Sequence, residues 1–289
     1  MNIYICELKE QEWKSPLLRA ALRSGLLDSS EAKELAQNEK KLQNQREHLT
    51  AWLLFQRALG EIYGIQTLSE LALARTRQGK PYSRTYSELH FNLSHCRTAC
   101  ACALDTIPAG IDIERRFPYK EKLMHRICTE KERQIVESCK SLSERERLLQ
   151  ALWSMKESIV KWNGRGIGYG MKRVDCSKWL TGYADEIKVD ICLTPIKNAA
   201  GKQKFDVSMV ETPEWENPTL QKQIKEEIVC GSNSVMENES EEGNPELWML
   251  LSQKPEYTLA ACTAERKGTS DDWLKAVQIT EVREEELYE

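Results

Sequence analysis

Two short segments bring three carboxylates and a lysine into one chain, and they constrain it more than any other feature. In the first, apolar Ile111 and Ile113 alternate with Asp112 and Glu114 after the turn-like residues 107–110. This period-two pattern is typical of a strand with one apolar face, so both carboxylates point the same way, roughly 7 Å apart along the backbone. Two such carboxylates can converge on one hard cation. The alternative is that they form only the solvent face of an edge strand.

The second segment, residues 152–161, lies in a predicted helix that stops at Asn163-Gly164. Glu157 and Lys161 are four residues apart on it, so they share one face with Trp153 one turn before them. Taken alone, such a pair is typical of an ordinary surface ion pair contributing ~0.3 kcal/mol. The helix itself is predicted from apolar residues at alternating spacings of four and three, namely Leu148, Leu152, Met155 and Ile159.

With these residues in place, the chain resembles the Sfp-type 4'-phosphopantetheinyl transferases. The signature of that family is a G-[IV]-D-[IV]-E strand, followed by a [FW]-[ST]-x-K-E-[AS] helix motif that continues with two hydrophobic residues and a lysine. Both parts match here without a substitution. The resemblance implies that Asp112, Glu114 and Glu157 bind Mg²⁺ and that Lys161 contacts the phosphates of coenzyme A.

Two further stretches resemble motifs of the same family. Residues 77–82 contain its G-K-P turn, and residues 91–95 contain its F-N-[LI]-S-H motif. The resemblance implies that Lys80, Ser94 and His95 contact the nucleotide of coenzyme A. Their chemistry agrees, because lysine offers a point charge, serine a short donor and histidine a donor that charges near neutrality. The alternatives are a packed or capping histidine and a solvated turn lysine.

One more acid is a candidate. Thr129 and Glu132 have the spacing of a capping box, which predicts the start of a helix. The family places a glutamate that lines the metal site at a comparable helix start, and the flanking residues map it onto Glu132. Glu130 lies two residues away, so which of the two glutamates corresponds to the family's glutamate stays open. The capping role alone is the alternative for Glu132.

Two pairs of segments in the chain are weakly similar to each other. The helical pattern of residues 50–65 parallels that of 152–167, and the small-residue run 98–103 parallels 258–263. The family is built as two similar halves of an α/β (α+β) class, a pseudo-duplicated fold with the active site between the halves. The resemblance therefore predicts this architecture here.

The predicted division separates an N-terminal half, residues 1–108, from a C-terminal half, residues 109–289. The resemblance to the family becomes weaker after Asp175. Residues 231–245 are polar, acidic and nearly free of large apolar residues. Such a composition predicts a flexible loop. Strand-like runs lie at 187–193, 205–210, 257–263 and 276–280.

Composition excludes several classes of protein. The net charge of -4, without a basic stripe carrying interleaved aromatics, argues against a nucleic-acid binder. No signal peptide and no membrane span are visible, so we expect a cytoplasmic protein without a membrane partner. We also expect the protein to act as a monomer. The ten cysteines lack the spacing of a zinc site, and we expect reduced thiols, with Cys100 and Cys102 on one buried face.

The resemblance implies a Mg²⁺-dependent transferase of the holo-[acyl-carrier-protein] synthase type. It would move 4'-phosphopantetheine from coenzyme A to a serine of an apo acyl or peptidyl carrier protein, releasing adenosine 3',5'-bisphosphate. Glu157 or Glu132 would accept the serine proton, beside Lys161. The alternatives are a metal-dependent nucleotide phosphohydrolase and a non-catalytic relative that binds coenzyme A. The candidates for contacting the 3'-phosphate of coenzyme A are Lys40, Lys41 and Arg46.

Overall fold

The computed structural model describes residues 1–10, 12–164, 166, 170–177, 180, 247–264 and 276–289. The acidic stretch 231–245 lies outside these residues, as do the strand-like runs at 187–193 and 205–210. The described part mixes helices and sheets, in agreement with the predicted α/β class.

The N-terminal part of the chain forms one strand, a group of helices and then short hairpins. The first elements are β1 (Asn2–Glu7), α1 (Lys14–Arg23), α2 (Ser29–Gln37) and α3 (Glu39–Tyr63). They are followed by η1 (Leu68–Leu71), β2 (Leu73–Arg75), β3 (Pro81–Ser83), β4 (His90–Cys96) and β5 (Ala99–Asp105). Strands β2 and β3 form their own hairpin, while β4, β5 and β1 pair antiparallel in one sheet.

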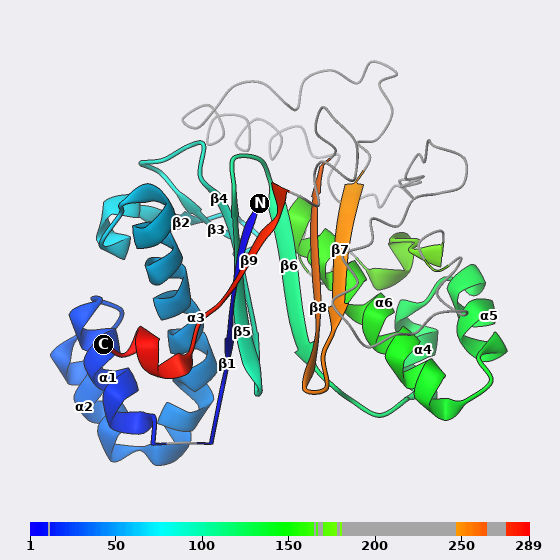
Figure 1. Cartoon of the computed structure of the whole chain (residues 1–289), viewed down its shortest axis with the longest axis horizontal. Coiled ribbons are helices and arrows are strands. Elements are labelled where there is room, and N and C mark those ends of the chain that lie inside the picture. The colour runs from blue at the N-terminus through cyan, green and yellow to red at the C-terminus, as the bar shows by residue number, and fades with distance from the viewer. Residues whose placement is uncertain (11, 165, 167–169, 178–179, 181–246, 265–275) are drawn as a thin grey trace.

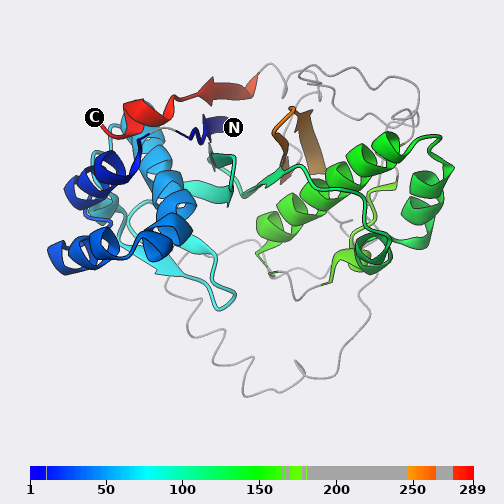
Figure 2. The same ribbon diagram turned by 90° about the horizontal axis from the view of Figure 1, so that it is seen from below.

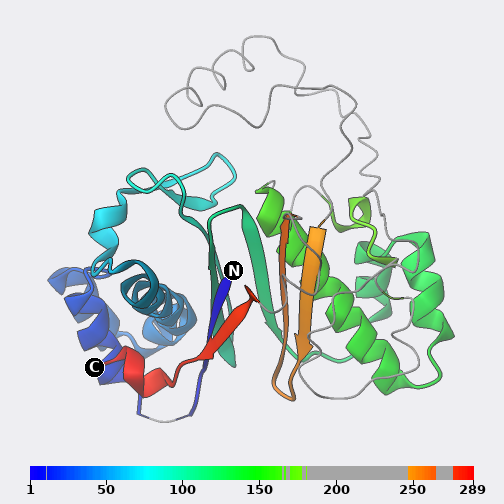
Figure 3. The ribbon, with the colours of Figure 1, turned by 45° about the horizontal axis from the view of Figure 1, so that its top comes forward.

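The second part builds a three-stranded sheet, in the order β6-β8-β7, and its covering helices. Its elements are β6 (Ala109–Arg115), α4 (Glu121–Ile127), α5 (Glu130–Ser138), α6 (Leu142–Asn163), η3 (Met171–Arg173), β7 (Leu247–Gln253) and β8 (Tyr257–Ala264). The chain then returns to the first sheet, where β9 (Gln278–Glu281) pairs in parallel with β1, before η6 (Glu284–Leu287). Figure 3 shows β9 and η6 beside the N-terminal elements.

The two sheets face each other, with α1–α3 outside one and α4–α6 outside the other (Figures 1 and 2). The alternation along β5 explains this layering, because Ala99, Ala101 and Ala103 face the second sheet while Cys100 and Cys102 face the helices. Alanine side chains on the inner face allow the sheets to pack closely. The expected placement of Cys100 and Cys102 on one buried face is confirmed.

The two long helices end in the same way. Helix α3 ends at Gly64 and α6 at Gly164, with φ of 71° and 69°, and glycine is the residue that adopts this left-handed cap most readily. The stop predicted at Asn163-Gly164 is therefore confirmed. Within the described residues, no helix combines the length and the apolar composition that crossing a lipid bilayer would require.

Candidate functional site

The site is built where β6 lies against α6. Gly110 makes this close approach possible, since a Cβ atom there would lie 1.9 Å from the backbone oxygen of Ser158 and 2.6 Å from the backbone nitrogen of Trp162. Only glycine fits without moving one element away from the other. As predicted, β6 is a strand whose Ile111 and Ile113 face the other sheet. Because β6 alternates, Asp112 shares the face of Gly110, toward α6.

Three carboxylates influence one another at this contact. Asp112 and Glu157 are each 5% exposed, so Asp112 does not lie on a solvent face, although β6 is at the edge of its sheet. Burial and the negative charges of Asp112 and Glu114 together raise the pKa of Glu157 to about 7, against the opposing effect of Lys161. Burial and the neighbouring Asp112 likewise raise the pKa of Glu114. The fold has therefore concentrated negative charge that a bound cation would neutralise.

Lys161 and Ser94 complete the cluster. The Nζ atom of Lys161 lies 2.8 Å from Asp112 Oδ1 and donates to Ser94 Oγ at 2.8 Å. Ser94 Oγ also donates to Asp112 Oδ1 at 3.1 Å. The lysine therefore sits between a carboxylate and a hydroxyl that come from different sheets.

The donor set fits a divalent cation that prefers oxygen ligands. In the described structure, Asp112 Oδ2 and Glu157 Oε1 are buried and have no hydrogen-bond partner. Buried carboxylate oxygens are costly unless something binds them. Across the described ranges, no three His, Cys, Asp or Glu side chains already converge as a complete metal site. Mg²⁺ usually takes one or two carboxylates and keeps several waters, so it does not require such a closed cage.

Strand β4 joins the two sheets through its side chains. Asn92 Oδ1 accepts the backbone N–H of Ile111 at 2.9 Å, and Ser94 Oγ accepts that of Ile113 at 3.1 Å. These bonds satisfy the edge of β6 that does not pair with β8. Asn92 was not among the predicted site residues. The signal was a polar residue two positions before Ser94, hence on the same face of a strand.

His95 lies on the opposite face of β4, against α3. Its Nδ1 lies 3.8 Å from Glu47 Oε2, and its ring meets that of His48 edge-on with 5.9 Å between ring centroids. Burial and the charge of Lys161 lower the pKa of His95. The structure therefore separates the two motif residues, with Ser94 inside the carboxylate cluster and His95 beside α3.

The side chain of Lys80 contacts the backbone of the two elements that carry the carboxylates. Its Nζ donates to the carbonyl oxygens of Lys161 at 2.7 Å, Trp162 at 3.1 Å and Ala109 at 3.4 Å. Burial lowers its pKa to about 8. The solvated-turn alternative does not describe this side chain, which connects the β2–β3 hairpin to the end of α6 and the start of β6.

Glu132 forms the predicted capping box with Thr129 but lies in a separate buried network. Its carboxylate pairs with Lys156 at 2.7 Å, with both side chains fully buried, and it accepts the backbone N–H of Cys176 at 2.7 Å. Lys156 also donates to the carbonyls of Met171 and Val174. The structure thus brings Asp112, Glu157, Lys161 and Ser94 together but engages Glu132 elsewhere.

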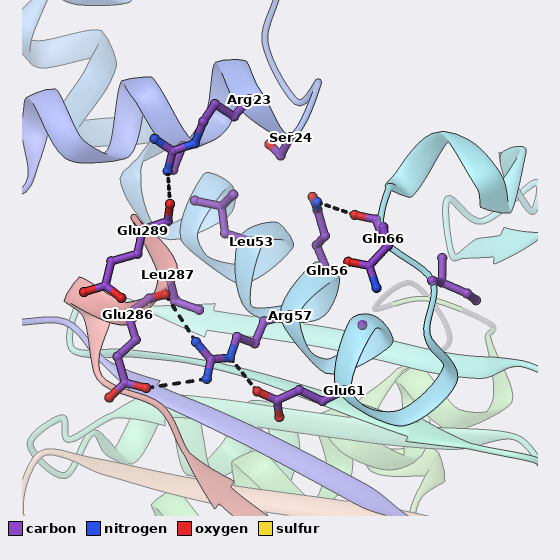
Figure 4. A pocket seen from close by; sticks show the side chains of 13 residues that line it. Arg23, Ser24, Leu53, Gln56, Arg57, Glu61, Gln66, Glu286, Leu287 and Glu289 are labelled. Atoms are coloured by element: carbon purple, nitrogen blue, oxygen red, sulfur yellow. Dashed lines mark hydrogen bonds and ion pairs between the residues drawn. The ribbon is translucent and has the colours of Figure 1, made fainter.

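Two concave surfaces lie on the described part of the protein. One, of about 470 Å³, adjoins Glu114 and combines basic with apolar side chains; it is lined by Glu114, Arg115, Phe117, Lys120, Lys122, Leu123, Arg126 and Trp153. We call it the basic groove. The other, of about 560 Å³, lies among α1, α3 and the C-terminal residues, where Arg57 pairs with Glu61 at 2.6 Å (Figure 4). None of the predicted site residues lines this second cavity.

Part of this chain is similar to known proteins. Residues 108–200 match the model of the 4'-phosphopantetheinyl transferase superfamily. The 4'-phosphopantetheinyl transferase psf-1 of Bacillus pumilus is 32% identical over 143 residues, which covers 50% of this chain and 60% of that relative. The 4'-phosphopantetheinyl transferase Sfp of Bacillus subtilis (strain 168) is 33% identical over 99 residues, covering 34% and 44%.

A human relative is more distant. The human L-aminoadipate-semialdehyde dehydrogenase-phosphopantetheinyl transferase is 29% identical over 120 residues, covering 37% of this chain and 39% of that protein. The chain thus spans about half the length of the bacterial relatives that it matches. The matched superfamily region begins just before β6 and contains α6, the two elements that carry the carboxylates.

Proposed function

We propose, from the confirmed resemblance to the Sfp-type 4'-phosphopantetheinyl transferases, that this chain transfers 4'-phosphopantetheine from coenzyme A to a serine of an apo carrier protein. The observation that carries the proposal is the contact of Lys161 and Ser94 with Asp112, whose charge also acts on Glu157. Asp112, Glu157 and Lys161 lie within the region that matches the superfamily. The products would be the holo carrier protein and adenosine 3',5'-bisphosphate.

Asp112, Glu114 and Glu157 would hold Mg²⁺. A bound Mg²⁺ ion supplies charge neutralisation to the pyrophosphate of coenzyme A. One oxygen each of Asp112 and Glu157 has no hydrogen-bond partner among the described residues, which supports this assignment. The ammonium of Lys161 would contact the phosphates. Its hydrogen bond to Ser94 keeps it close to the carboxylates.

We assign the proton acceptor to Glu157 rather than Glu132. Every oxygen of Glu132 is already engaged, by Lys156, the Thr129 N–H and the Cys176 N–H, and its side chain is fully buried. An incoming serine hydroxyl has no access to such a group. Glu157 has an oxygen without a hydrogen-bond partner in the described structure and lies beside Asp112.

The basic groove is our candidate for the acceptor surface. It adjoins Glu114 and exposes basic side chains around Phe117, Leu123 and Trp153. Carrier proteins of the class implied by the resemblance are usually acidic, so opposite charges would guide the encounter. The serine would thereby approach the carboxylate cluster from the side of Glu114.

We also infer that the two sheet layers are similar halves with the active site between them. Each layer has one long helix that ends at a left-handed glycine, Gly64 or Gly164. The repeated small-residue segments are β5 and β8, each with a strand on both sides in its own sheet. Ser94 from the first layer meets Asp112 and Lys161 from the second.

The direct test is to incubate the protein with coenzyme A, Mg²⁺ and several apo carrier proteins, then to measure the intact mass of each carrier. We expect one carrier to gain a phosphopantetheine group only when Mg²⁺ is present. Consumption of coenzyme A without any acceptor would instead identify a phosphohydrolase. Binding of coenzyme A without either reaction would identify a non-catalytic relative.

A further inference from the structure

The geometry points to Lys80 as a positioning residue that holds the end of α6 to the start of β6 and so sets the spacing of the carboxylate cluster. This inference rests on the proposed transferase function for its kinetic consequences. Its structural basis is the contact of one ammonium with three backbone carbonyls, those of Lys161, Trp162 and Ala109.

Two of these carbonyls belong to the last turn of α6. The final carbonyls of a helix have no partner within the helix, and a lysine close to them satisfies that need. The third carbonyl, of Ala109, opens β6. One side chain therefore binds both elements that carry the proposed metal ligands, since Asp112 and Glu114 lie on β6 and Glu157 lies on α6.

The Lys80 amine has no N–H left for a phosphate. A protonated lysine has three N–H donors, and the three carbonyls account for all of them. Its stem also lies against the helix cap, because a Cβ atom on Gly164 would be 3.6 Å from Lys80 Cδ. The contact pattern differs from the coenzyme A role that the G-K-P resemblance implies.

The hairpin holds Lys80 firmly in its turn. The backbone N–H of Lys80 donates to Thr76 Oγ1 at 3.1 Å, and its carbonyl accepts from the Thr76 N–H at 2.9 Å. Gly79 precedes it with a φ of 88°, which glycine adopts without strain. The amine is therefore presented from a fixed backbone, as a positioning group requires.

The two roles of Lys80 predict different kinetics. Lys80→Met keeps the apolar stem and removes the donors, so α6 and β6 lose their shared anchor. We expect kcat to fall by about 10- to 100-fold, as is common when a group supporting metal ligands is lost, with KM for coenzyme A changed less than about threefold. Lys80→Arg, which keeps N–H donors, should recover part of kcat. Arg77→Met is the control, because it removes an exposed positive charge from the same hairpin.

A measurement independent of turnover completes the test. Mn²⁺ serves as the probe, and its affinity by electron paramagnetic resonance should fall by about tenfold in Lys80→Met and stay unchanged in Arg77→Met. A rise in KM for coenzyme A with unchanged kcat and Mn²⁺ affinity would overturn the inference in favour of a phosphate contact. If Lys80→Met does not fold, Lys80→Gln takes its place, with the same expected and opposing results. If the parent protein transfers nothing, the proposed function fails, whereas the Mn²⁺ comparison still decides the role of Lys80.

Discussion

At the scale of single residues, Asp112 and Glu157 share one cluster but differ in their partners. Asp112 Oδ1 is bound by Lys161 and Ser94, whereas burial and the nearby charge of Asp112 raise the pKa of Glu157 to about 7. A group whose pKa is raised by folding is less stable as an anion in the folded state than in the unfolded state. The same chemical change at the two sites should therefore have opposite effects on stability.

We predict that Asp112→Asn and Glu157→Gln each reduce transfer by at least about 100-fold, because both lose a negative charge needed to retain Mg²⁺. At pH 8 without metal, Glu157→Gln should raise the melting temperature and Asp112→Asn should lower it. Glu34→Gln, at an exposed position on α2, is the control and should change neither. Activity within a few-fold of the parent in both variants would remove the metal-site assignment.

His95 gives a prediction that depends on pH. Its pKa is lowered by burial and by Lys161, so the imidazole is neutral at pH 7.5 and gains charge only in acid. If it contacts a phosphate, His95→Ala should weaken coenzyme A binding more than carrier binding, with a larger loss at pH 5.5 than at pH 7.5. Added salt should reduce the loss at pH 5.5 most strongly. Calorimetric titration measures this, and an equal loss of both affinities would support a packing role.

Sequence patterns predicted the elements and faces on which the candidate residues lie better than they predicted their contacts. The spacing of Asp112, Glu157 and Lys161 placed them on the correct strand and helix faces, since period and face are local properties. The contacts of Lys80, Asn92 and Glu132 depend on which elements pack together. A local pattern does not contain that information.

At the scale of elements, the distance between β6 and α6 decides whether the site forms. Gly110 sets that distance because a Cβ atom would overlap the α6 backbone. The strand and the helix were each predicted from periodicity and end close to their expected residues. Their contact was not predicted, because the need for glycine arises only from the close approach of another backbone.

We predict that Gly110→Ala lowers the free energy of unfolding by at least about 2 kcal/mol and reduces transfer, since α6 must move away from β6. The control is Gly60→Ala in α3, where a Cβ atom would lie 3.7 Å from its nearest contact, the Ile65 carbonyl. Alanine in a helix is favoured over glycine by ~1 kcal/mol, so the control should be neutral or more stable. Urea unfolding measures both, and a fully stable Gly110→Ala would contradict the packing described.

At the scale of the whole molecule, the chain closes on itself because residues 278–287 pack against the N-terminal elements. Strand β9 lies beside β1, and the following η6 carries Glu284 into the helical layer of the N-terminal half. Such pairing between the two ends of the sequence has no local signature, so the strand-like run at 276–280 was recognised but its partner was not. The predicted division into residues 1–108 and 109–289 stays a prediction, and β9 belongs to the sheet formed mainly by the first of these parts.

The closure depends on a buried ion pair. Arg46 on α3 donates to both carboxylate oxygens of Glu284, at 2.8 and 2.9 Å, and the two side chains are 7% and 0% exposed. The guanidinium also lies 4.4 Å from the ring centroid of Trp13 and donates to the carbonyl of Lys9. These contacts occupy the Arg46 side chain, which was a candidate for binding the 3'-phosphate of coenzyme A.

We predict that Arg46→Met lowers the free energy of unfolding by about 3–5 kcal/mol, because it leaves the Glu284 carboxylate buried without its charge partner. The double variant Arg46→Met with Glu284→Gln should recover part of that loss, since the unpaired charge is then absent. Coenzyme A affinity of the folded fraction should stay within about threefold of the parent, as should that of Lys33→Met, which removes an exposed charge from the neighbouring helix α2. Chemical unfolding and calorimetric binding measure the two effects separately. A large loss of coenzyme A affinity with unchanged stability would return Arg46 to the nucleotide site and leave the closure of the chain to β9 alone.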